Sequence, residues 1–141
     1  MTLDLSSLEN ALTQLEQVLA RARDEAFMSA QDDITRNAIR AGVIQHFEIV
    51  YELCWKFIKR WLRLNRSPEE ADYPRTRKEL FRMAAESGLV ADPLAWFSYS
   101  GARNLMAHTY NEAEAEKIYD QAMPLARDAR YLLERLIEKN D

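Results

Sequence analysis

Apolar residues recur at alternating steps of three and four along most of the chain, which is the period of helices with one buried face. In the first such stretch, Ser6-Ser7-Leu8-Glu9 has the form of a capping box. We therefore expect a helix to begin at Ser6, with its hydroxyl accepting from the Glu9 N–H, and to fray over residues 28–31. Its apolar positions are Leu5, Leu8, Leu12, Leu15, Leu19, Ala22 and Ala26.

The longest periodic stretch runs from Ile34 to about Asn65 and contains one glycine and no proline. Asp32 or Asp33 can cap its first turn. The apolar positions on its inner face are Ile39, Val43, Phe47, Val50, Cys54, Phe57 and Trp61. Ile44, Tyr51, Ile58 and Leu62 widen this apolar face into a broader arc around the helix. An arc this broad predicts burial on two sides, by the core and by either a second subunit or a partner.

The prolines at positions 68 and 74 predict a loop, because each disfavours the helical conformation of the residue before it. A short helix is expected to start at Arg75 or Thr76 and to end at Ser87. Thr76 and Glu79 have the spacing of a second capping box. Gly88 suits a left-handed cap at the end of this helix.

Asp92-Pro93 matches an N-cap followed by a first helical residue, and predicts a helix running towards Met106. Asn111, followed by acidic residues, is expected to cap the last helix, which ends near Lys139. Pro124 lies inside that helix and predicts a kink in the four residues before it.

No stretch shows the sustained alternation that is typical of strands. The pattern therefore predicts an all-α bundle of four or five helices, forming a single domain over residues 1–141. The composition agrees, with 48% hydrophobic and 30% charged residues, three glycines and four prolines. A chain of this length buries enough surface to fold without a disulfide or metal.

The chain has a single cysteine, Cys54, which lies in an apolar run and is expected to be a buried small hydrophobe. Without a pair to form a disulfide, a reducing cytoplasm is the expected compartment. There is no leader-like start and no apolar run of about 18 residues, so neither a signal peptide nor a membrane span is expected.

The net charge of -4 argues against a protein that coats nucleic acid by bulk electrostatics. The charge is uneven, however, because residues 56–82 carry nine basic and four acidic side chains, a local excess of +5. This segment is either a solvated helix face or a surface that faces phosphate or an acidic partner.

The sequence lacks the residue spacings of metal and phosphate sites. Two histidines and one cysteine, at positions 46, 54 and 108, are too scattered for a zinc site, and there is no glycine-rich phosphate loop. We expect no metal and no cofactor in this chain. His46 is expected to be a satisfied structural histidine, and Glu52 and Lys56 have the spacing of a solvated ion pair.

The stretch RNLMAHTY carries the most distinctive chemistry. Five residues separate Arg103 from His108, which in a straight helix places them about 140° apart around the axis and about 7.5 Å apart along it. We therefore expect the helix to end or turn between them, or the pair to meet across a subunit boundary. The predicted cap at Asn111 favours a helix junction here.

Arginine offers a fixed fork of donors to phosphate oxygens, and histidine can transfer a proton near neutral pH. Arg103 and His108 could thus support metal-free RNA cleavage, in which the 2′-hydroxyl attacks the adjacent phosphorus. The alternative is structural, with Arg103 bound to helix-end carbonyls or acidic residues and His108 capping the helix.

Two longer segments, residues 39–62 (IRAGVIQHFEIVYELCWKFIKRWL) and 96–119 (WFSYSGARNLMAHTYNEAEAEKIY), extend this pattern. Together they resemble the nucleotidyltransferase substrate-binding protein family, a branch of the HEPN superfamily. The most specific parts are Phe47-Glu48, Tyr51-Glu52-Leu53, Trp55-Lys56, Arg103-Asn104 and His108-Thr109-Tyr110-Asn111.

The resemblance implies an antiparallel, up-and-down HEPN-like bundle that dimerises and associates with a separately encoded minimal nucleotidyltransferase. That partner would supply the nucleotide and metal site. Within the resembling segments, Glu48, Tyr51, Lys56 and Trp96 are candidates for contacting the partner or supporting the site.

The resemblance also assigns roles within RNLMAHTY. Arg103 and His108, with Asn104 as the polar residue after the arginine, correspond to the catalytic residues of metal-independent endoribonuclease toxins. Tyr110 corresponds to a tyrosine that receives a nucleotide and so silences the toxin. The leading hypothesis is a substrate-binding and acceptor subunit in a toxin–antitoxin system, and the alternative is an RNA-cleaving toxin; a dimer without chemistry is a third.

Overall fold

The computed structural model describes residues 2–67, 69, 74–108 and 112–140, without the side chains of 105–108. Its helices are α1 (Ser6–Ala22), α2 (Glu25–Ser29), α3 (Asp33–Asn65), α5 (Arg77–Glu86), α6 (Pro93–His108) and α7 (Glu112–Glu138). The described ranges contain no strand, so the predicted all-α fold is confirmed. The short helix α2 was not predicted, because residues 25–29 were expected to continue the first helix.

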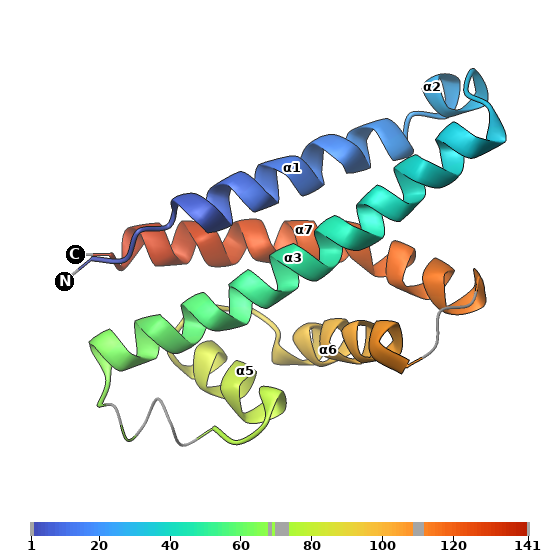
Figure 1. The fold of residues 1–141 in the computed structure, drawn as a ribbon. Coiled ribbons are helices and arrows are strands. Elements are labelled where there is room, and N and C mark those ends of the chain that lie inside the picture. The colour runs from blue at the N-terminus through green and yellow to red at the C-terminus, as the bar shows by residue number, and fades with distance from the viewer. Residues whose placement is uncertain (1, 68, 70–73, 109–111, 141) are drawn as a thin grey trace.

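The long helices run up and down alongside one another (Figure 1). α1 packs against α3 and α7, while α6 packs against α7 and α3, and α5 packs against α6 and α3. The two chain ends lie side by side in Figure 1. They are tied together by Asn140, whose side chain accepts from the Leu3 N–H at 2.8 Å and donates to the Leu3 carbonyl at 3.0 Å.

Helix α3 is the centre of the packing. Its fully buried residues include Val43, Phe47, Val50, Cys54 and Ile58, each 0% exposed. Burial on two sides was predicted, and both sides are covered by helices of the same chain: α1 and α7 on one, α5 and α6 on the other. The broad apolar arc of α3 is thus explained without a second subunit or partner.

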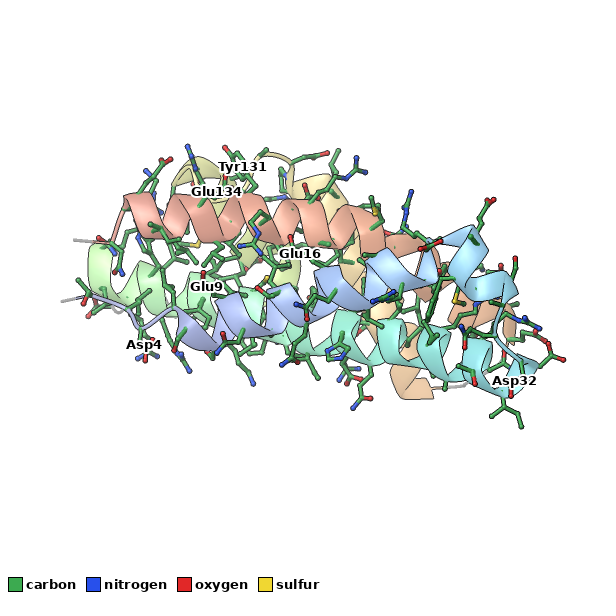
Figure 2. The ribbon with its side chains drawn as sticks, turned by 90° about the horizontal axis from the view of Figure 1, so that it is seen from above. Asp4, Glu9, Glu16, Asp32, Tyr131 and Glu134 are labelled. Atoms are coloured by element: carbon green, nitrogen blue, oxygen red, sulfur yellow. The ribbon has the colours of Figure 1, made fainter. Side chains whose placement is uncertain are left out.

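The seam between α1 and α7 carries a cross-helix ion pair. Glu16 lies at this seam in the view from above (Figure 2). Its carboxylate accepts two hydrogen bonds from the Arg130 guanidinium, one of them from Nε at 3.2 Å. A two-point contact of this kind fixes the relative position of the helices more tightly than a single contact does.

Several helix ends follow the local sequence rules. Asp32 accepts from the Thr35 N–H at 2.8 Å and caps α3. At the start of α5, the Thr76 hydroxyl accepts from the Glu79 N–H at 3.2 Å, and the Glu79 carboxylate accepts from the Arg75 N–H at 2.9 Å. Gly88 ends α5 with a φ of 77°, as predicted.

The predicted serine cap of the first helix is wrong. α1 has no side-chain cap, and the Glu9 N–H donates to the Leu5 carbonyl. The nearby Asp4 carboxylate accepts from the Ser6 N–H at 3.0 Å, and hydrogen bonding by the Ser6 side chain and backbone lowers the pKa of Asp4. The Leu5 carbonyl thus takes the N–H expected for the Ser6 hydroxyl, and Asp4 takes the Ser6 N–H that the Glu9 carboxylate would bind in a capping box.

The last helix contains Pro124, as predicted. The axis of α7 changes direction between its orange first turns and its red remainder in Figure 1. Its expected cap, Asn111, lies outside the described residues. None of the helices in the described part of the chain is long and apolar enough to cross a membrane.

Candidate functional site

Arg103 on α6 lies against two carboxylates of α3. Its Nη2 is 3.1 Å from Oε1 of Glu48, and its Nε is 3.3 Å from Oε1 of Glu52. Because Glu48 and Glu52 are four residues apart on one helix, their side chains lie on the same face. The planar guanidinium lies within ion-pair distance of both at once, although its buried Nε is not aligned for a hydrogen bond, so the two glutamates hold Arg103 by charge.

The contacts continue from Glu52 to a third helix. The second carboxylate oxygen of Glu52 accepts from the indole N–H of Trp55 at 2.9 Å. The guanidinium of Arg77, at the start of α5, lies over the Trp55 ring, 3.4 Å from its centroid. Side chains of α6, α3 and α5 thus form one connected network.

The predicted ion pair between Glu52 and Lys56 is wrong, because Glu52 contacts Arg103 and Trp55 instead. Lys56 is exposed, and its Nζ lies 5.7 Å from the centroid of the Trp55 ring. Of the candidates for site support, Lys56 therefore lies at the edge of this network.

Tyr51 and Trp96 lie beneath the network, at 2% and 1% exposure. The Tyr51 hydroxyl is 2.6 Å from Ser100 Oγ, and the Ser100 hydroxyl donates to the Trp96 carbonyl at 3.0 Å. Burial raises the pKa of the Tyr51 phenol, against the opposing effect of the Ser100 hydrogen bond. Both side chains are buried and support the site from the core.

A hollow of about 940 Å³ opens beside Arg103. It is lined by Tyr51, Glu52, Thr76, Arg77, Lys78, Phe97, Ser98, Ser100, Gly101, Arg103 and Asn104. Asn104 is exposed at the hollow, next to Arg103 along the chain. The hollow therefore joins Arg103 and Asn104, two of the predicted catalytic residues, to the basic start of α5.

The expected break between Arg103 and His108 is wrong, because α6 continues through His108. The two positions are thus about 140° apart around one helix axis and about 7.5 Å apart along it. The described residues include the backbone but not the side chain of His108, and Tyr110 lies outside them. Within one chain the helix therefore does not bring the two positions together, and the contacts of Arg103 with Glu48 and Glu52 agree with the structural alternative for this arginine.

Some features of this hollow, and one histidine outside it, were missed or wrongly predicted from sequence. Arg77, Lys78 and Phe97 were not singled out, although the first two belong to the +5 segment. His46 was expected to be satisfied, but its buried Nδ1 has no hydrogen-bond partner in the described part of the chain. Among those residues, no three His, Cys, Asp or Glu side chains are grouped so as to hold a metal ion.

The fold has close counterparts among solved structures. A structure from Haemophilus influenzae, described as the substrate-binding domain of a nucleotidyltransferase, superposes with a TM-score of 0.88 at 32% identity, covering 95% of this chain and 99% of that one. A crystal structure from Thermus thermophilus gives a TM-score of 0.68 at 29% identity, covering 92% and 98%.

The sequence comparisons agree. The family model described as "Nucleotidyltransferase substrate binding protein like" matches residues 3–138. A Haemophilus influenzae protein named "Probable ribonuclease HepT" is 33% identical over 138 residues, which span 98% of this chain and 94% of that protein. The chain belongs to the nucleotidyltransferase substrate-binding protein family.

The clamp on Arg103 predicts a measurable coupling with Glu52. In a double-mutant cycle of Arg103→Ala and Glu52→Gln, we expect a coupling of about 0.5–1 kcal/mol in the free energy of unfolding, because the pair is partly shielded from water. Urea denaturation measures it. The more exposed pair of Arg40 and Glu116, 3.5 Å apart, is the control and should couple more weakly. Equal couplings for the two pairs would contradict a clamp.

Proposed function

We propose that this chain is a metal-independent endoribonuclease that works beside a nucleotidyltransferase. Arg103 binds the scissile phosphate, Asn104 donates a hydrogen bond to it, and His108 transfers a proton. The observation that carries the proposal is the position of Arg103, held by two carboxylates at the edge of a basic hollow. The name of the Haemophilus influenzae relative supports the same activity.

The clamp leaves part of Arg103 free for a substrate. Its shortest contacts with Glu48 and Glu52 are made by Nη2 and Nε, and the side chain is 26% exposed and lines the hollow. A guanidinium has five N–H donors in a fixed fork, so donors that do not face the two glutamates can face a phosphate oxygen. The glutamates thus act as positioning residues for Arg103.

The proposed reaction needs only groups of the RNA and the protein. The 2′-oxygen attacks the adjacent phosphorus and the bond to the 5′-oxygen breaks, which leaves a 2′,3′-cyclic phosphate and a 5′-hydroxyl. The proton of the 2′-hydroxyl goes to a base, and the leaving oxygen receives a proton from an acid, the two tasks for which an imidazole near neutral pH is suited. Arg103 stabilises the charge that develops on the phosphate.

We further propose that the site is shared between two copies of the chain. The continuous helix α6 separates positions 103 and 108 too widely for one face. In a two-fold symmetric dimer whose α6 helices meet, Arg103 of one copy can face His108 of the other. The homodimer is thus part of the proposed function.

A cleavage assay on single-stranded RNA in the presence of EDTA tests the ribonuclease. We expect cleavage by the native protein and a loss of about 100-fold or more in Arg103→Ala and in His108→Ala, because each removes a group used in the transition state. The matched control is Arg127→Ala, which changes an exposed arginine of α7. Cleavage that survives both site substitutions would rule out this mechanism.

A second function concerns the partner. The family description and the Haemophilus influenzae structure support association with a nucleotidyltransferase. We propose that this partner is a separately encoded minimal enzyme and that it transfers a nucleotide to Tyr110, two residues after His108. A bulky, negatively charged group beside the site would block RNA, so the pair would act as toxin and antitoxin in the cytoplasm.

The acceptor role is tested by mass spectrometry after incubation with the partner and ATP. We expect one nucleotide to be added per chain and none in Tyr110→Phe, because the phenol oxygen is the proposed nucleophile. Tyr131→Phe, which alters an exposed tyrosine of α7, is the control and should be modified normally. Equal addition to the native chain and Tyr110→Phe would exclude Tyr110 as the acceptor.

A further inference from the structure

The hollow beside Arg103 extends well beyond the residues given a part in the chemistry. Its lining also includes Thr76, Arg77 and Lys78 around the start of α5, and Phe97 of α6. Its volume of about 940 Å³ is near the upper end of the range of about 300–1,000 Å³ for small-molecule sites. There is thus space for a nucleotide next to the one that would lie on Arg103.

Positive charge dominates the hollow. Arg77, Lys78 and Arg103 line it, with Glu52 as the one carboxylate in the lining, so the excess is two positive charges. It falls to one when Glu48, which also contacts Arg103, is included. Arg103 lies between these glutamates, whereas Arg77 and Lys78 are exposed. The positive charge that carries none of these glutamate contacts is therefore on Arg77 and Lys78, at the α5 side of the hollow.

The same side presents an aromatic ring. Phe97 is half-buried in the lining, with Lys78 Nζ 5.7 Å and Arg82 Cζ 5.3 Å from its ring centroid. The Trp55 ring nearby is covered by Arg77. An aromatic side chain among basic groups is the combination by which proteins bind single-stranded nucleic acid, with the base stacked on the ring and the phosphate on the cations.

The position of Arg77 is fixed by the fold. It starts α5 directly after the Thr76 cap, and its guanidinium rests on Trp55, whose N–H is bonded to Glu52. Because Glu52 also contacts Arg103, the two arginines are held by one shared network. A substrate with phosphates at a regular spacing would meet both.

We propose that Arg77, Lys78 and Phe97 form a second nucleotide-binding subsite for the RNA substrate, with the two cations on a phosphate neighbouring the scissile one and a base on Phe97. This inference rests on the proposed ribonuclease function. It assigns to the basic start of α5 the task of holding single-stranded RNA across the hollow.

The test is binding of a fluorescent single-stranded RNA to the His108→Ala protein, which keeps the subsite intact. Adding Lys78→Ala or Arg77→Ala should weaken binding by roughly 5- to 10-fold and reduce the slope of log affinity against log salt by about 0.7 per lost phosphate contact. Phe97→Leu should weaken binding with the salt slope unchanged, because stacking is lost and charge is kept. Lys78→Arg should retain binding.

The control is Lys139→Ala in the His108→Ala protein, which removes an exposed lysine outside the hollow and should bind RNA as tightly as His108→Ala alone. Thermal melts of each variant separate a lost contact from a lost fold.

If the native protein cleaves RNA and the His108→Ala protein binds it, but the α5 variants of the His108→Ala protein bind equally well, the subsite is wrong and the ribonuclease stands. If the α5 variants keep RNA binding and instead lose the nucleotidyltransferase, the α5 side is a protein interface and the subsite is again wrong. If the native protein neither binds nor cleaves RNA, both proposals fail.

Discussion

The burial of α3 on both of its sides is the constraint on which the rest of the structure depends. Its apolar arc is too wide for one partner helix, so α1 and α7 cover one side while α5 and α6 cover the other. Residues such as Phe47 and Phe57, at 0% and 1% exposed, are enclosed by this arrangement. Any rearrangement that removed α5 and α6 would expose a large apolar surface to water.

This packing also creates the site. The polar edge of α3, with Glu48, Glu52 and Trp55, lies where α6 and α5 meet it. Arg103 and Arg77 reach that edge from the two other helices. The cations are fixed by groups of α3, and the hollow between the helices is left with an excess of positive charge. Fold and candidate chemistry therefore share one cause.

Sequence rules worked where the determining contacts are local. The caps at Asp32 and Thr76 and the glycine at position 88 each depend on residues within a few positions, and all three were predicted. The Ser6 capping box is absent because the Leu5 carbonyl accepts from the Glu9 N–H and Asp4, just outside the motif, accepts from the Ser6 N–H. Contacts between helices could not be derived in this way. Glu52 contacts Arg103, 51 positions away in sequence, and not its neighbour Lys56. Arg77 and Lys78 line the hollow because α5 packs on α6. Helical periodicity states which side of a helix is apolar, but not which helix covers it or which charges then meet.

The central claim is that a site with Arg103 and His108 is completed between two copies, since α6 runs through both positions without a break. The most direct test is to mix the inactive variants Arg103→Ala and His108→Ala, allow subunits to exchange, and measure cleavage of single-stranded RNA. A mixed dimer would unite an intact Arg103 with an intact His108, so the account predicts that activity returns to a substantial fraction of the native level. A mixture as inactive as its two components, with mixed dimers shown to form, would contradict it.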